Sequence, residues 1–583
     1  MPNILKKIKD FINGDGGFYV ILVWLTTIIF LPAVWYKYSY FDDYYLIVQG
    51  QKYLADLSNM FNIFGSDVFR ADTVAYRPLL IASFMLDAKI AGTSPWIYHL
   101  TNIVIHYVCG CLLFLLLRRF EVSRVRSFFL SAFFLVHPLM VQAVAWIPGR
   151  NDTLLGLWLL CFVISLVNYC KSRGWYWIAV SMLSLAGGLF TKEAAVGFPL
   201  VGLMLLFAGI GKGSRVINRV FIFLGWLAIT LGWLYIRDSV ITANPGTGQM
   251  ELNSAWENIQ GMLGYAGKVL FPFNLSVLPI PKANMVWYGL VALMVLLVFI
   301  RVGGVKNRNI FYFGLAMAVI FLAPHLLRGT DFAFYHEHRI YVSFVGAIIM
   351  LSQINWPHKI KLGRLVYPVL PWIVLTFYAV ITILRLPLYY DQDSLLLNLV
   401  ANEPQVALSY TQWGYIFIER GEYEKAGLYY KKALQLEPKN KDIYHGLGMV
   451  YELLGQWHKA EHNLLRGLEL APRSSSLRYN LAYLYHQRGD ADRAERQYKL
   501  AILSRPENLE AQLNLGMLYH QKGKLEKARR QYLRTLDIDG RIPEALFNLG
   551  ILYRQMGSND SSRLYLDRAL KIKPELIRLL GKK

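Results

Sequence analysis

Long apolar runs separated by short basic connections fill the first two thirds of the chain. A helix needs about 20 mostly apolar residues to cross a bilayer, and about eleven runs approach this length. They predict an all-α, polytopic membrane domain over residues 1–390. The expected spans are 18–36, 97–117, 127–146, 153–170, 175–191, 194–210, 217–237, 286–300, 310–327, 340–355 and 365–386.

The Lys and Arg residues of the connections orient these spans, because cytoplasmic loops carry an excess of them. The stretch 256–271 is moderately apolar, but a crossing there would move the basic connection 301–308 to the opposite side. We interpret it as an interfacial or re-entrant helix in an outer loop at 238–285, and a second outer loop covers 37–96. The amino terminus is predicted inside and the carboxyl terminus outside, in the inner or plasma membrane of the cell.

After about residue 402 the chain becomes charged, and a period of 34 residues begins. This spacing of small residues, glycine and closing proline is typical of the tetratricopeptide repeat. It predicts a linker at 391–404 and five extracytoplasmic repeats over 405–583, in a superhelix whose concave face binds protein segments. The alternative is an array that only supports or oligomerises the membrane domain. The glycines expected to end the first helix of each repeat are Gly421, Gly455, Gly489, Gly523 and Gly557.

Composition changes this picture little. The net charge of +22 reflects cytoplasmic loops and basic repeats, and no basic patch interleaved with stacking aromatics indicates nucleic-acid binding. The four cysteines fall in or at the ends of predicted spans and indicate neither a disulfide framework nor a thiolate zinc site. They are Cys109, Cys111, Cys161 and Cys170.

Acidic and basic residues gather at the predicted outer ends of the spans, where an ion facing lipid is costly. The adjacent carboxylates Asp42 and Asp43 follow the first span. Each other cluster alone could be an interfacial anchor, a neutralised pair or a solvated loop. Together they suit an anionic lipid-linked substrate, because arginine grips phosphate and a carboxylate takes a proton from a hydroxyl. The other members are Arg77, Arg150, Asp152, Lys192, Glu193, Glu337, His338 and Arg339.

Further polar residues lie inside predicted spans. His99, Asn102 and His106 share one face of the second span, because they are three and seven residues apart. We interpret them as an interhelical hydrogen-bonded face; a zinc site is the alternative, and it lacks a further ligand. His137 precedes a proline within the third span.

These motifs resemble those of the transmembrane and tetratricopeptide-repeat-containing O-mannosyltransferases. The likeness covers nearly the whole length, includes the domain order and indicates a bacterial-type relative. The repeat array is short beside the long repeat tails of animal members, and no feature specifies mannose. The motifs are Asp-Asp at 42–43, Tyr-Arg-Pro-Leu at 76–79, His-Leu-Thr-Asn-Ile-Val-Ile-His at 99–106, His-Pro at 137–138, Trp-Ile-Pro-Gly-Arg-Asn-Asp at 146–152, Thr-Lys-Glu at 191–193 and Glu-His-Arg-Ile-Tyr at 337–341.

The resemblance implies a GT-C glycosyltransferase with a polyprenyl- or dolichyl-phosphate-linked sugar as donor. It implies that Asp42 or Asp43 activates the acceptor hydroxyl, and it does not decide between them. It further implies that Arg339, with Lys192 or Arg77, holds the lipid phosphate, to which we add Arg150 and His338 as candidates. The supporting polar residues are then Glu193, Glu337, His99, Asn102, His106, His137 and Asp152.

The implied reaction is inverting transfer of one sugar to Ser or Thr of an extracytoplasmic protein, recruited by the repeats. It needs no soluble cofactor; a divalent metal bridging Asp42 and Asp43 to the phosphate is the alternative. Two other functions fit the sequence: the same chemistry on a glycolipid or an envelope polysaccharide, and a non-catalytic scaffold for envelope assembly. The clusters of acids and bases argue against the scaffold, which has no need of them.

Overall fold

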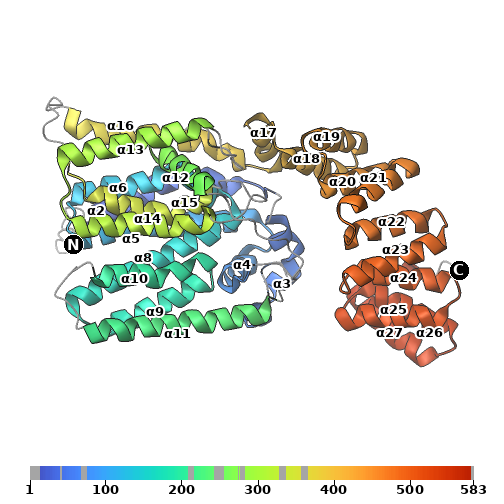
Figure 1. Cartoon of the computed structure of the whole chain (residues 1–583). Coiled ribbons are helices and arrows are strands. Elements are labelled where there is room, and N and C mark those ends of the chain that lie inside the picture. The colour runs from blue at the N-terminus through green and yellow to red at the C-terminus, as the bar shows by residue number, and fades with distance from the viewer. Residues whose placement is uncertain are drawn as a thin grey trace, which may run out of the picture. The chain divides into compact units, whose positions relative to one another are not determined.

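The computed structural model describes residues 14–39, 43–66, 68, 75–207, 216–241, 255–272, 275, 283–326, 337–355, 366–402 and 404–579. The chain divides into two compact units, Met1–Glu403 and Pro404–Lys583 (Figure 1). Within the described residues every named element is helical, and Val305 and Ile354 form an isolated antiparallel bridge. The predicted all-α class is confirmed.

Six described helices of the first unit are long and apolar enough to cross a membrane, and a bent pair makes a seventh candidate. Shorter apolar helices occupy the remaining predicted spans, so each of those spans overlaps a helix. The helices are α2 (Gly16–Phe30), α5 (Pro95–Arg119), α6 (Arg124–Val136), α7 (Val141–Ala145), α8 (Arg150–Ser172), α9 (Tyr176–Leu189), α10 (Phe198–Phe207), α11 (Val216–Val240), α13 (Ala283–Gly303), α14 (Arg308–Leu326), α15 (Ile340–Ser352) and α16 (Val366–Arg385).

The bent pair, α6 and α7, turns by 48° at His137-Pro138. Proline lacks the N–H that would continue the helix, and it disfavours helical backbone at the residue before it. His137 is accordingly extended, and its Nδ1 accepts a hydrogen bond from the Leu139 N–H at 3.2 Å. After the bend, α7 packs against α5, α8 and the short turn Glu337–Arg339.

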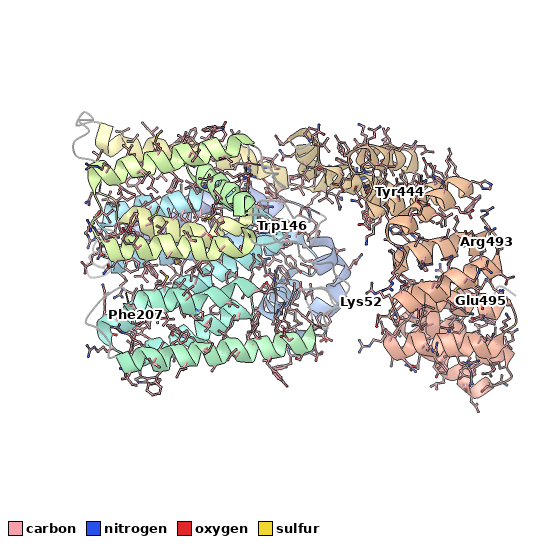
Figure 2. All side chains as sticks on the ribbon, in the orientation of Figure 1. Lys52, Trp146, Phe207, Tyr444, Arg493 and Glu495 are labelled. Carbon is pink, nitrogen blue, oxygen red and sulfur yellow. The ribbon has the colours of Figure 1, made fainter. Side chains whose placement is uncertain are left out.

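The long helices lie side by side, and their connections gather at two opposite ends (Figure 1). Phe207 lies at one end and Trp146 at the other (Figure 2). At the first end the Arg118 guanidinium lies 3.3 Å from the Asp15 carboxylate, and we call it the Arg118 end. The short helices α3 (Gln51–Ala55) and α4 (Pro78–Ala91) lie at the other end (Figure 1). We call it the Asp43 end, because Asp43 precedes the short helix Tyr44–Gln49 that contacts α3.

α12 (Ala255–Leu270) packs along α13 at very short range. Gly267 and Gly289 allow this approach, because a Cβ on Gly289 would lie 2.1 Å from the Leu263 carbonyl oxygen. Its length and composition leave α12 outside the candidate spans of the described residues. The interpretation of this segment as an interfacial or re-entrant helix stays a prediction.

The predicted linker at 391–404 is largely helical. α17 (Gln392–Asn402) occupies it, and the first unit extends to Glu403 instead of ending near 390. The Asp391 carboxylate accepts hydrogen bonds from the Ser394 N–H at 2.9 Å and the Ser394 hydroxyl at 2.8 Å. These bonds cap the start of α17, a signal that an acidic residue before a helix provides in the sequence.

The second unit consists of five helix pairs, as the period predicts. Gly455 ends one first helix with a φ of +69°, a left-handed conformation that glycine adopts without strain, and the four equivalent glycines do the same. Gly448 faces Leu464 of the paired helix, where a Cβ would lie only 2.7 Å from that side chain. The pairs are α18 (Ala407–Glu419) and α19 (Tyr423–Leu436), α20 (Lys441–Leu453) and α21 (Trp457–Leu470), α22 (Ser475–Gln487) and α23 (Ala491–Ser504), α24 (Leu509–Gln521) and α25 (Leu525–Ile538), and α26 (Pro543–Gln555) and α27 (Asn559–Ile572).

Candidate active site

Asp43 is a buried carboxylate at the start of the short helix Tyr44–Gln49. Its Oδ2 accepts hydrogen bonds from the Ser39 N–H at 2.9 Å and from the Ser39 hydroxyl at 2.7 Å. These two donors fix the orientation of the carboxylate and stabilise its charged form. Asp42, the other predicted catalytic residue, lies outside the described residues.

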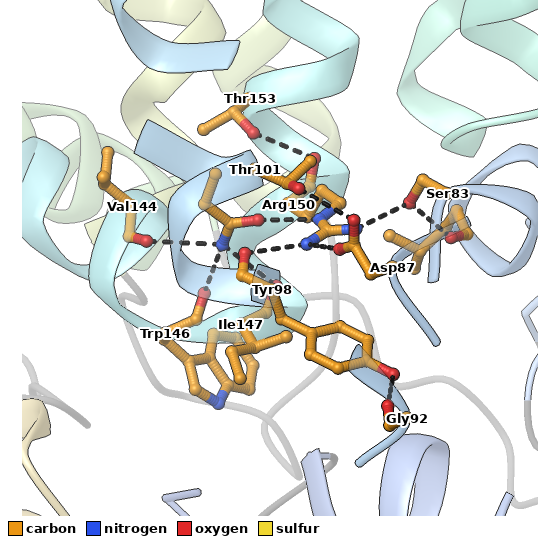
Figure 3. Close-up of polar contacts among 12 residues, drawn as sticks. Ser83, Asp87, Gly92, Tyr98, Thr101, Val144, Trp146, Ile147, Arg150 and Thr153 are labelled. Atoms are coloured by element: carbon orange, nitrogen blue, oxygen red, sulfur yellow. Dashed lines mark hydrogen bonds and ion pairs between the residues drawn. The ribbon is translucent and has the colours of Figure 1, made fainter. Parts of the chain in front are cut away.

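Arg150, at the start of α8, is enclosed by protein groups (Figure 3). Its Nη2 lies 2.6 Å from Asp87 Oδ2, and its Nε donates to Asn102 Oδ1 at 2.7 Å. Further donations reach the Ser83 hydroxyl at 3.2 Å and the Tyr98 carbonyl at 2.8 Å. The guanidinium therefore joins α4, α5 and α8, and its placement does not fit the donor-phosphate role that we assigned it.

Asp87 is the counter-ion of Arg150, and it was not among the residues predicted from the sequence. It lies on α4 and also accepts a hydrogen bond from the Thr101 hydroxyl at 2.8 Å. Burial raises the pKa of Asp87, while Arg150 and Thr101 act to lower it. A carboxylate inside a mostly apolar helix was the available signal, because such a residue needs a partner.

Asn102 and His106 make hydrogen bonds between helices, as expected of a shared polar face. The Asn102 amide donates to the carbonyls of Val144, Trp146 and Ile147 at 3.2 to 3.3 Å. His106 Nδ1 lies 2.8 Å from the Tyr341 hydroxyl, and Nε2 lies 3.1 Å from the Leu135 carbonyl. His99, one turn before Asn102, is buried and faces the Tyr36 ring edge-on at 6.2 Å.

Lys192 joins the turn after α9 to the first turn of α8. Its Nζ lies 2.6 Å from Asp152 Oδ1 and 3.5 Å from Asn151 Oδ1. Burial lowers the pKa of Lys192; Asp152 acts to raise it, and Arg77 and Arg339 act to lower it. The positive charges of Lys192, Arg77 and Arg339 thus repel one another at this turn. A bound anion would stabilise this arrangement.

Arg77 and Glu193 form a partly exposed ion pair beside Lys192. The Arg77 Nη2 lies 3.1 Å from Glu193 Oε2, and the two side chains keep 21% and 28% exposure. The Leu79 N–H donates to the Phe190 carbonyl at 3.0 Å, so the start of α4 is fastened to the end of α9. Arg77 is therefore more accessible to a ligand than Arg150 is.

Glu337 lies between two cations from other helices. Lys268 Nζ of α12 lies 3.2 Å from Oε1, and Arg385 Nη2 of α16 lies 2.5 Å from Oε2. All three side chains are almost fully buried, with exposures of 0%, 4% and 5% for the acid, the lysine and the arginine. Lys268 and Arg385 were missed in the sequence, although basic residues at the Asp43 end contradict the charge bias of the loops.

His338 and Arg339 follow Glu337 in the same turn. The His338 N–H donates to Gln142 Oε1 at 3.1 Å, and its Nε2 lies 4.0 Å from Asp152 Oδ2. Arg339 is partly exposed at the start of α15. His137 lies near the same end, with Nε2 3.0 Å from the Val269 carbonyl at the end of α12. The Glu337 turn and α12 are therefore both fastened to the bend between α6 and α7.

The described residues bring together Lys192, Asp152, Arg77 and Glu193, with the charge of Arg339 acting on the same lysine. No group of three or more His, Cys, Asp or Glu side chains in the described part could hold a metal ion.

The matches to known protein families lie in the second unit. Models of tetratricopeptide-repeat families match residues 414–455, 463–496 and 507–575. The second unit is a tetratricopeptide-repeat array. In the region of the repeats the chain resembles protein O-mannosyl-transferases, at 30% identity to Tmtc1 of Drosophila melanogaster over 142 residues and 32% to TMTC2 of Homo sapiens over 127 residues.

These matches are partial. They cover 24% and 21% of this chain, and 16% and 15% of the two relatives, so the chain spans about a sixth of the relatives' length. Among solved structures, the array is similar to MamA, at 24% identity and a TM-score of 0.26 over 28% of this chain and 96% of the other. It is also similar to YrrB, described as a repeat protein with an unusual peptide-binding site, at 22% identity and 0.27 over 32% and 95%. The resemblance of the membrane motifs stays a prediction.

Proposed function

We propose that the protein is a membrane glycosyltransferase of GT-C type, which transfers a sugar from a polyprenyl-phosphate-linked donor to Ser or Thr of extracytoplasmic proteins. The observation that carries the proposal is the set of buried, paired carboxylates and cations at the Asp43 end of an apolar helical unit. Ions are costly in such a unit, and they are typical of functional sites there. The similarity of the repeats to O-mannosyl-transferases supports the same class.

The proposed step needs a base and a cationic site for the leaving group. Asp42 or Asp43 takes the proton of the acceptor hydroxyl, whose oxygen forms a bond to the anomeric carbon of the sugar. The bond from that carbon to the phosphate oxygen breaks, and the lipid phosphate leaves with the added negative charge. Inversion follows from attack on the face opposite the phosphate. Arg339 and Arg77 both keep some exposure to solvent, so a ligand can reach them. Their positive charges stabilise the charge of the leaving phosphate.

Ser39 supports the proposed base. Its N–H and hydroxyl both donate to Asp43, so we assign Ser39 a positioning role in either case. If Asp43 is the base, the bonds aim its carboxylate; if Asp42 is the base, they hold the loop that carries it. The Lys and Arg bias of the loops supports an orientation in which the Asp43 end and the repeats lie outside the cytoplasm.

The test uses the full-length protein in lipid nanodiscs. Glycoproteomics of cells with and without the gene identifies the sugar and the acceptor, and that pair is then assayed with purified lipid donor. We expect Asp42→Asn and Asp43→Asn each to lower the transfer rate at least 100-fold at an unchanged melting temperature. Asp56→Asn is the matched control, because Asp56 lies on the same outer loop and its carboxylate accepts a hydrogen bond from the Ser58 N–H at 2.9 Å.

Full activity of both aspartate variants would contradict the catalytic proposal. If cells without the gene lose the sugar on a lipid or a polysaccharide while their proteins stay modified, the alternative acceptor class is supported.

A further inference from the structure

We infer that Tyr390 is a positioning residue for the proposed transfer, because it holds the chain segment that leads to Asp43. The inference rests on the proposed function, since it assigns a support to the loop that carries the proposed base. It uses described residues of the first unit alone.

The supported segment is residues 36–39. It follows the short turn Leu31–Trp35 at the end of α2 and has no helix or strand of its own. Such a stretch lacks a regular set of internal hydrogen bonds, so its place depends on the groups around it. Ser39, at its end, donates its N–H and its hydroxyl to Asp43. The contacts that hold residues 36–39 therefore also orient the Asp43 carboxylate.

Tyr390 contacts this segment in three ways. Its carbonyl accepts a hydrogen bond from the Lys37 N–H at 2.8 Å. Its ring meets the Tyr36 ring nearly edge-on, with centroids 5.5 Å apart and planes at 77°, a geometry that aromatic pairs favour. The Lys37 ammonium lies 5.7 Å from the centre of the Tyr390 ring, within the range of a cation–π contact. Tyr390 thus contacts both the main chain and the side chains of the segment.

Two further contacts of the segment come from α5 and the turn before it. The Tyr36 ring lies 6.2 Å from the His99 ring, and the Tyr38 hydroxyl donates to the Thr93 carbonyl. These contacts hold two tyrosine side chains, whereas Tyr390 also holds the main chain. A segment without secondary structure needs such a main-chain partner to keep one course.

Tyr390 is itself firmly placed in the bundle. It follows the short turn Leu386–Tyr389 at the end of α16, and this turn contacts α7. Just before the turn, Arg385 Nη2 lies 2.5 Å from Glu337 Oε2, and its Nη1 donates to the Pro138 carbonyl at 3.0 Å. A residue that is fixed in this way can fix a loop that contacts it.

The exposure of Tyr390 separates its role from that of its neighbours. Leu386 and Tyr389 are 2% and 1% exposed and pack the turn into the bundle, whereas Tyr390 is 40% exposed. Removal of such a side chain usually changes the stability of a protein little. Loss of the Tyr390 ring should therefore affect mainly the segment that it contacts.

Tyr390 also lies where the chain leaves the bundle. The next residue, Asp391, caps α17 by accepting hydrogen bonds from Ser394. α17 contacts the turn Leu386–Tyr389, and the second unit begins at Pro404. A shift of α17 would therefore reach the segment before Asp43 through Tyr390.

The first test measures order without catalysis, in the full-length protein in nanodiscs. Hydrogen exchange, read by mass spectrometry with fragmentation, follows the amides of residues 36–39 and of the short helix Tyr44–Gln49. We expect Tyr390→Ala to speed exchange of the Lys37 amide about 10-fold and that of the helix about threefold, because the segment loses its support. Tyr390→Phe should keep the wild-type rates, since it retains the ring. The control is Phe61→Ala, which removes an 85% exposed aromatic side chain from the same outer loop.

The second test measures transfer with the donor and the acceptor identified for the proposed function. Misplacement of a reacting group by about 1 Å can cost about 100-fold in rate, and the hydrogen bonds from Ser39 remain, so we expect Tyr390→Ala to lower kcat about 10-fold. The donor KM should stay within about twofold, because Arg77 and Arg339 lie on other elements. Tyr390→Phe should have the wild-type kcat, and the melting temperature should be unchanged in both variants.

Four results would overturn the inference or its basis. Wild-type exchange at Lys37 in Tyr390→Ala would show that the residue does not support the segment. Faster exchange at an unchanged kcat would show that the support does not position the base. A raised donor KM at an unchanged kcat would assign Tyr390 to donor binding instead. Full activity of both Asp42→Asn and Asp43→Asn would refute the proposed function and the catalytic part of the inference, while the exchange rates would still report the support of the segment.

Discussion

The Lys192 ammonium lies 2.6 Å from Oδ1 of Asp152, and the two side chains are only 8% and 2% exposed. The pair connects residues of two turns that are distant in the sequence, at the end of the bundle that holds the other acids and bases. Breaking such a pair leaves one buried charge without its partner, which costs more than removing both charges.

We therefore expect Lys192→Met to destabilise the protein by about 3 kcal/mol, and Lys192→Met with Asp152→Leu to recover at least half of the loss. Denaturant titration of the unit in detergent micelles measures both. The exposed pair Lys425 and Glu422 of the second unit provides the control, because Lys425→Met should change stability by less than about 0.5 kcal/mol. Equal losses in the single and the double variant would show that the two charges are not coupled.

Arg150 and Arg339 should respond differently to replacement by lysine. Lysine keeps the charge at position 150 but cannot reach Asp87, Asn102, Ser83 and the Tyr98 carbonyl together. Arg150→Lys is thus expected to cost about 2 kcal/mol of stability, with a donor KM within twofold of the wild type. Arg339→Lys should raise the donor KM at least fivefold at an unchanged melting temperature. A raised donor KM for Arg150→Lys, without loss of stability, would return Arg150 to the phosphate site.

The local patterns of the sequence were sufficient for the fold. Apolar runs predicted the long helices of the membrane unit, and the 34-residue period predicted the repeats, because both depend on neighbours within one or two helices. The helical α17 was missed, although Asp391 before Ser394 carried the capping signal. Its short length and mixed composition gave no clear periodicity.

The contacts between side chains of the candidate site could not be predicted from local patterns of the sequence. That Arg150 bonds Asp87, or that Glu337 lies between Lys268 and Arg385, depends on how distant helices pack. From the sequence, the charged residues could be grouped only by the membrane face on which their loops were expected. It could not separate a buried arginine with four partners from a partly exposed one such as Arg77, since burial of a loop residue is decided by the whole bundle.

Glu337 should be more important for stability than either of its cations alone. Glu337→Gln leaves Lys268 and Arg385 buried without a negative charge, and we expect a loss of about 3 kcal/mol. Lys268→Met leaves the acid paired with Arg385, so the loss should be about 1 kcal/mol. Thermal unfolding in micelles ranks the variants. A smaller effect for Glu337→Gln than for Lys268→Met would mean that the two cations have partners other than this carboxylate.

Glu452 on α20 should make the second unit less stable as the pH rises. Burial raises the pKa of Glu452 to about 7, above its ordinary value of 4.5. The folded unit therefore holds this proton more tightly than the unfolded chain, so the contribution is fully present below about pH 4.5 and is lost as the pH rises through about 7.

Because the side chain remains partly exposed to solvent, we expect this loss to be about 1 to 2 kcal/mol, less than the full pKa difference implies. Glu452→Gln should remove it, so the variant and the wild type diverge in stability between pH 5 and about 8, with the variant more stable at the upper end. Hydrogen exchange of the α20 and α22 amides, followed by mass spectrometry at several pH values, reports the unit separately from the membrane helices. The matched control is Glu510→Gln at the exposed start of α24, whose curve should run parallel to the wild type. Parallel curves for Glu452→Gln as well would show that this carboxyl takes up no proton on folding.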